Sequence, residues 1–96
     1  MKGNKESVSK KVRITNELGM HARAAAKFVK LASSFVAEIS VSKDDQTVNG
    51  KSIMGILMLA AGEGAEITVS ASGKDAAEAL FALESLVKQG FGENHK

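Results

Sequence analysis

The segment of the chain best suited to chemistry is Gly19-Met20-His21-Ala22-Arg23. Apolar spacing after it predicts a helix that begins beside His21, and the first amides of a helix have no partner inside it. These amides and the positive end of the helix dipole attract anions, and Arg23 adds a guanidinium suited to phosphate oxygens. A neutral imidazole is nucleophilic near physiological pH, and Gly19 permits a sharp bend that exposes the ring. The segment predicts a phosphoryl acceptor at His21, stabilised by Arg23 and by the amides of Ala22 and Arg23.

Two other interpretations of His21 follow from the residue type alone. Most histidines carry no chemistry, so His21 taken by itself is equally a polar residue at a helix start. A metal site is disfavoured because the only other histidine is His95, and a transition-metal site normally needs three or four ligands. We therefore expect neither a metal nor a cofactor.

Hydrophobic periodicity predicts the elements that must position His21. Alternation of apolar and polar residues predicts strands over 8–14, 37–41, around 47–48 and over 67–71. Helical spacing predicts helices over 22–33, 53–59 and from 76 to about 89. The order is βαββαβα. Strands with one apolar face imply an α+β fold in which a mainly antiparallel, four-stranded sheet is covered on one face by three helices.

Local signals mark the ends of the predicted helices. Ser52 is placed to cap the short helix, and Gly90 to end the last one in a left-handed conformation. Asp75 and Glu78 have the spacing of a capping box, in which Asp75 accepts from an amide of the first turn and Glu78 reaches back.

Composition favours one small globular domain. The 96 residues are 44% hydrophobic and 25% charged, and the net charge of +2 comes from scattered lysines, which argues against nucleic-acid binding. No window reaches the length of a membrane span, and no signal peptide is recognisable, so we expect a cytoplasmic protein. We divide the chain into a flexible leader (1–7), a domain (8–91) and a tail (92–96).

Two separated motifs in register resemble the HPr family, the histidine-containing phosphocarriers of the bacterial phosphoenolpyruvate-dependent phosphotransferase system. They are the His21 segment with its alanine-rich helix and the segment Val48-Asn49-Gly50-Lys51-Ser52-Ile53-Met54-Gly55. The resemblance covers roughly residues 8–91 and implies an open-faced β-sandwich. It implies that His21 accepts a phosphoryl group from Enzyme I and donates it to a IIA domain or a related regulator, and that the protein is a carrier rather than an enzyme. Arg23 would steady the transferring group.

One position departs from the family pattern. The family usually has proline after the arginine, where this chain has Ala24. Proline presets the torsion of the first helical turn, so we expect slower or weaker transfer without it.

Ser52 resembles the serine that HPr kinase/phosphorylase modifies in many family members. A phosphate at a helix start is compatible with the fold, so the added charge would act on docking.

A docking surface is a further expectation, because more apolar residues surround these motifs than a short helix and one loop easily bury. The alternative, that they belong to the core, stays open. Methionine adapts to partners of different shape, and basic side chains steer acidic ones. The predicted docking residues are Met20, Lys27, Lys51, Ile53, Met54 and Leu57, with Arg23 at the rim.

Rival functions are distinguishable. Leu18-Gly19-Met20-His21 and Gln89-Gly90-Phe91 look like a nitrogen-branch phosphocarrier with regulatory acceptors, whereas Lys51-Ser52-Ile53-Met54-Gly55 looks like the kinase-regulated sugar branch. An RNA-binding sheet is disfavoured because Phe28 and Phe81 fall on helix stripes and not on strands. A face shared by several partners favours a monomer.

Overall fold

A computed structural model describes residues 7–93 of the chain. The strands are β1 (Ser7–Arg13), β2 (Glu38–Lys43), β3 (Gln46–Asn49) and β4 (Glu66–Ser72). The helices are α1 (Ala22–Ser33), α2 (Ile53–Met58) and α3 (Ala76–Lys88), and a 3₁₀ turn, η1 (Gly90–Gly92), follows α3. The predicted order of strands and helices is confirmed, and η1 is an addition to it.

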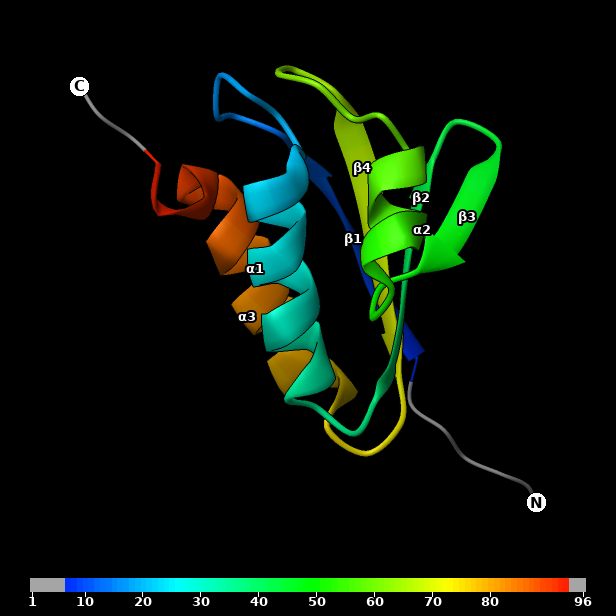
Figure 1. Cartoon of the computed structure of the whole chain (residues 1–96). Coiled ribbons are helices and arrows are strands. Elements are labelled where there is room, and N and C mark those ends of the chain that lie inside the picture. Colours follow the sequence, from blue (N-terminus) through cyan, green and yellow to red (C-terminus); the bar gives the residue numbers. More distant parts are fainter. Residues whose placement is uncertain (1–6, 94–96) are drawn as a thin grey trace.

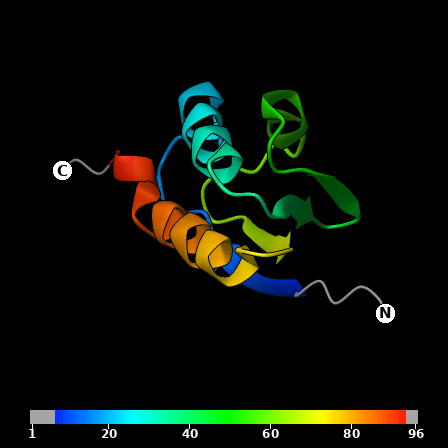
Figure 2. The same ribbon diagram turned by 90° about the horizontal axis from the view of Figure 1, so that it is seen from below.

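The strands form one four-stranded antiparallel sheet in the order β1-β4-β2-β3. Helices α1, α2 and α3 lie on the same side of the sheet, and the opposite face is open (Figures 1 and 2). This is the predicted open-faced sandwich. No helix within residues 7–93 has the length and apolar character needed to cross a bilayer.

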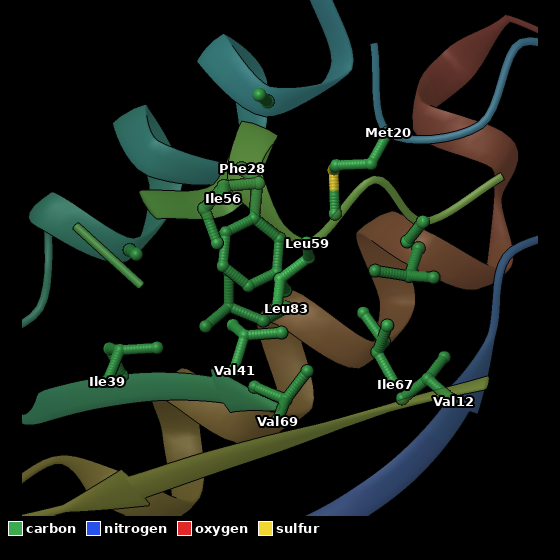
Figure 3. Close-up of a cluster of buried hydrophobic side chains, with 14 of the residues drawn as sticks. Val12, Met20, Phe28, Ile39, Val41, Ile56, Leu59, Ile67, Val69 and Leu83 are labelled. Atoms are coloured by element: carbon green, nitrogen blue, oxygen red, sulfur yellow. The ribbon is translucent and has the colours of Figure 1, made fainter. Parts of the chain in front are cut away.

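Register places the apolar residues of neighbouring strands side by side under the helices. Val12 of β1 pairs with Ile67 of β4, and Val41 of β2 pairs with Val69 of β4. Their side chains are buried together with Phe28 of α1 (Figure 3). Other large side chains that are fully buried are Ile14, Ile56, Leu83, Val87 and Phe91. The alternation in the sequence therefore identified the inward face of the sheet correctly.

The structure differs from the expected division of the chain at both ends. Ser7 is the first residue of β1 and pairs with Ser72, although we placed it in the leader. Gly92 closes η1, and Glu93 is only 17% exposed, although we placed both in the tail. The rest of the expected leader and tail, residues 1–6 and 94–96 with His95, lies outside the described residues.

The capping box predicted at Asp75 is wrong. Asp75 stands at the N-cap of α3, but its side chain makes no cap hydrogen bond with the described helix. Its carboxylate instead accepts hydrogen bonds from the amides of Val36, at 3.0 Å, and Ala37, at 2.7 Å. The bond from Val36 is the main cause that lowers the pKa of Asp75. The amides of Val36 and Ala37 need an acceptor, and the Asp75 carboxylate supplies it. These two bonds tie the loop before β2 to the start of α3.

We expect Asp75→Ala to lower the melting temperature at pH 7, because it removes both bonds to the loop before β2. The lowered pKa means that the stabilisation is present above the unfolded pKa of the carboxyl and is lost as the pH falls through the folded one. The difference from wild type should therefore shrink below about pH 4. Circular dichroism melts at several pH values measure it, with Asp45→Ala in the exposed turn as control. An equal difference at all pH values would contradict the charge-based explanation.

Candidate functional site

The loop that leads to α1 is fitted closely against the loop before β4. The amide of Met20 donates to the carbonyl oxygen of Ala61 at 2.8 Å. Gly19 adopts a φ of +67°, and a β-carbon there would lie 2.7 Å from both the Ala61 oxygen and the Cα of Gly62. Only glycine combines this torsion with this close approach. The position of His21 therefore depends on a backbone contact that a side chain at residue 19 would break.

His21 is the N-cap residue of α1, as predicted. Its backbone is extended, with φ −80° and ψ −177°, and its side chain makes no cap hydrogen bond to the described first turn. The first intrahelical bond runs from the amide of Ala25 to the carbonyl of His21 at 2.8 Å. The amides of Ala22, Arg23 and Ala24 precede that bond, so they are the helix donors with no carbonyl partner in the helix. The imidazole therefore lies beside the helix start without bonding to its amides, which leaves these amides available for an anion.

A carboxylate from the far end of the chain contacts the ring. Nε2 of His21 lies 2.7 Å from Oε2 of Glu93, and the two side chains are 28% and 17% exposed. The other oxygen of Glu93 accepts from Nδ2 of Asn16 at 3.0 Å. Nδ2 of Asn16, which is buried, also donates to the carbonyl of Gly19 at 2.8 Å. Asn16 thus joins the glycine turn, the carboxylate and the ring in one network.

Charge decides which ring nitrogen carries the proton. The hydrogen bond from His21 is the main cause that lowers the pKa of Glu93, helped by Asn16 and by the charge of Lys27. Glu93 is therefore ionised at neutral pH, and an ionised carboxylate only accepts hydrogen bonds. Nε2 must be the donor in this pair, so a neutral ring has its lone pair on Nδ1.

The turn that carries Glu93 is anchored on both sides. Gly90, with φ +66°, ends α3 as the sequence predicted, and Phe91 next to it is 1% exposed. Nζ of Lys27 on α1 donates to the carbonyl of Phe91 at 2.7 Å. Figures 1 and 2 show the end of the described chain beside the loop that leads to α1. Glu93 is held towards His21 by elements that are themselves packed.

Neither Glu93 nor Asn16 was predicted to belong to the site. The contact between residues 21 and 93 spans 72 positions, and no periodicity connects them. The only signals in the sequence were an asparagine three residues before Gly19 and a carboxylate after Gly92, and such pairs are too common to single out.

The predicted docking residues are divided by the structure. The prediction that Met20 is a docking residue is wrong. Its side chain is 5% exposed and points into the core near Leu59 (Figure 3). Leu57 is partly buried against the core. Ile53 and Met54 are 43% and 69% exposed. The exposed apolar residues that sequence reasoning missed are Leu18, Val36, Met58 and Phe81.

Phe81 also corrects an expectation about α3. It was placed on the apolar stripe of that helix, but the buried residues are Ala76, Ala79, Leu83 and Val87. Phe81 is 71% exposed and lies off the stripe.

Both predicted docking lysines donate hydrogen bonds to backbone carbonyls of the same chain. Besides the bond from Lys27, Nζ of Lys51 donates to the carbonyl of Phe35, just after α1, at 2.8 Å. Lys51 thus lies at the C-terminal end of α1, whereas His21 lies at its N-terminal end. Of the two lysines, Lys27 is therefore the one that lies on the side of the fold where Glu93 and His21 meet.

Ser52 caps α2, as predicted, because its Oγ accepts from the amide of Gly55 at 3.0 Å.

Arg23 is exposed on the first turn of α1, and Ala24 is fully buried. The amide of Ala24 lies before the first intrahelical bond, so proline at this position would break no bond of the helix. Among residues 7–93, no three potential metal ligands come together.

Comparison with known proteins agrees with this geometry. The family model for the PTS HPr component phosphorylation site matches residues 8–89. A phosphocarrier protein HPr of Neisseria meningitidis serogroup A is 51% identical over 85% of this chain and 92% of its own.

Solved structures agree as well. HPr-C-His from Thermoanaerobacter tengcongensis superposes with a TM-score of 0.88 at 44% identity, over 92% of this chain and 99% of the other. HPr from Bacillus anthracis gives 0.82 at 49% identity, over 84% and 96%. The sheet and the covering helices are thus those of a small phosphocarrier. The chain belongs to the HPr family of the phosphotransferase system.

We expect Gly19→Ala to destabilise the protein by more than about 1 kcal/mol, since alanine is strained in the left-handed region and its β-carbon meets the Ala61 backbone. Gly62→Ala, on the other side of the same contact, is the control. Nothing lies within 4 Å of a β-carbon there, so its effect should stay below about 0.5 kcal/mol. Urea unfolding measures both, and equal losses would contradict the tight fit at Gly19.

Proposed function

We propose that His21 accepts a phosphoryl group from Enzyme I and passes it to a IIA domain or a related regulator. The observation that carries this proposal is the position of His21: a part-exposed imidazole stands at the N-cap of α1, beside amides with no partner in the helix. The membership of the chain in the HPr family supports the same partners.

The site offers what phosphoryl transfer requires. Nδ1 of a neutral ring has a lone pair for attack on phosphorus, because Glu93 holds the proton on Nε2. The amides of Ala22 and Arg23 and the guanidinium of Arg23 would stabilise the charge on the phosphoryl oxygens. The exposed part of the ring lets a donor approach, and transfer then depends on position and charge.

The surface beside His21 would meet the partners. Helix α2 packs against α1 (Figure 1). Its apolar residues Ile53, Met54 and Met58 are exposed. Leu18, in the loop before His21, is 68% exposed. Exposed apolar side chains grouped in this way are typical of protein contact surfaces. We therefore replace Met20 by Met58 and Leu18 among the proposed docking residues.

Incubation with Enzyme I and labelled phosphoenolpyruvate tests the carrier function. Wild type should gain an acid-labile, base-stable phosphoryl adduct, and His21→Ala should gain none, because the nucleophile is gone. His21 is an N-cap whose side chain does not cap the described helix, so the fold should survive the change. Melting curves check this point. Label on His21→Ala, or on neither protein, would overturn the proposal.

We further propose that Ser52 is phosphorylated by an HPr kinase/phosphorylase, which would place the chain in the sugar branch. The likeness of Lys51-Ser52-Ile53-Met54-Gly55 to the kinase-regulated motif supports this. The alternative is a nitrogen-branch carrier, supported by Leu18-Gly19-Met20-His21.

A kinase assay with ATP separates the two branches. We expect label on wild type and none on Ser52→Asn, which removes the hydroxyl but keeps an N-cap acceptor. Ser33→Asn, at the exposed end of α1, is the control and should still be labelled. No label on wild type would favour the nitrogen branch, and label on Ser52→Asn would place the modified residue elsewhere. Neither result would affect the role of His21.

A further inference from the structure

A surface hollow lies where α1 packs against α3, and Figures 1 and 2 show these two helices side by side. The hollow has a volume of about 400 Å³ and is lined by Lys27, Lys30, Leu31, Ser34 and Leu86. Leu31 and Leu86 are only partly buried against the core, so they give the hollow an apolar floor. The two lysines lie beside that floor.

The spacing of the lining residues on α1 suits a helical occupant. Lys27, Lys30, Leu31 and Ser34 stand at positions i, i+3, i+4 and i+7, which places them on one face of α1 and its C-cap. That face is about 10 Å long at the rise of an α-helix. Side chains of a third helix repeat at the same spacing and can enter the space between two packed helices. The hollow therefore fits about two turns of a helix with an apolar face.

Charge favours an acidic occupant. Helix α1 contains Arg23, Lys27 and Lys30 and has neither aspartate nor glutamate. The two carboxylates of α3, Glu78 and Glu84, are not among the described residues that line the hollow. Carboxylates beside the apolar face of a partner helix would thus meet lysines, whereas a basic helix would be repelled.

The hollow is separate from the surroundings of His21. Nζ of Lys27 donates to the carbonyl of Phe91, and this bond joins α1 to η1 at the end of the hollow nearer to His21. Leu31 lies about 15 Å further along α1 than His21, at the rise of an α-helix. Helix α2, with the docking residues proposed above, lies on a different side of α1 (Figure 2). An occupant of the hollow would leave the ring of His21 accessible.

We propose that the hollow between α1 and α3 binds an acidic amphipathic helix of a partner protein. This surface goes beyond the proposed function of His21 and does not depend on it. It gives the chain a second place of contact, at which a partner can bind while His21 exchanges its phosphoryl group.

A synthetic peptide of about 15 residues, long enough to form a helix by itself, is the probe. It carries leucines along one face and glutamates on both sides of that face. In ¹H–¹⁵N spectra of the whole protein, we expect the amides of Lys30, Leu31 and Leu86 to shift as the peptide is added. A peptide with lysines in place of the glutamates should bind at least about tenfold more weakly.

Lys30→Glu separates the charge at the hollow from the net charge of the protein. We expect it to weaken binding of the acidic peptide about fivefold, because a repulsion replaces a surface ion pair. Lys11→Glu is the matched control, since Lys11 is exposed in β1 and alternates with the inward-facing Val12. It makes the same change of net charge and should stay within about twofold of wild type.

Equal binding of the acidic and basic peptides, shifts at Met54 and Met58 instead of the hollow, or no shift at about 1 mM peptide would overturn the proposal. Shifts at Leu31 and Leu86 that follow the protein concentration without peptide would also overturn it, because a second copy would then cover the hollow. None of these results would affect the labelling of His21.

Discussion

The structure around His21 depends on the close approach of two backbones, at Gly19 and at Ala61. The bond from the Met20 amide to the Ala61 carbonyl fixes where the chain turns into α1. The same turn sends the Met20 side chain into the core and leaves His21 outside it. A loop that was free to move would place the imidazole at many angles to the helix start, and transfer would then lose the benefit of a prepared position.

The ring of His21 has two kinds of polar neighbour. The helix start offers donors on one side, which suit a phosphoryl group, and Glu93 offers an acceptor to Nε2. The ring therefore has an acceptor bonded to Nε2 and, beside it, helix donors that are suited to a phosphoryl group. The positive end of the helix dipole attracts the phosphoryl group, and the carboxylate would stabilise the cationic ring that the proposed transfer forms. The site is therefore a compromise between a nucleophile and a leaving group.

The sequence predicted those features that depend on neighbours along the chain. The alternation in β1, β2 and β4 identified the inward residues, and the helical spacing placed His21 and Ser52 at helix starts. Predictions failed where a long-range contact competed with a local one. Asp75 had the spacing of a capping residue, but two amides before β2 took its carboxylate. Met20 looked like a surface methionine, but the fit at Gly19 turns it inward, and Glu93 is recruited over 72 positions.

We propose that the first amides of α1 hold the phosphoryl group on His21. A ¹H–¹⁵N spectrum of wild type before and after phosphorylation by Enzyme I tests it directly. We expect large downfield shifts of the amide protons of Ala22, Arg23 and Ala24, because each would gain an anionic acceptor or lie next to one. A phosphorylated histidine with these three resonances unchanged would contradict it.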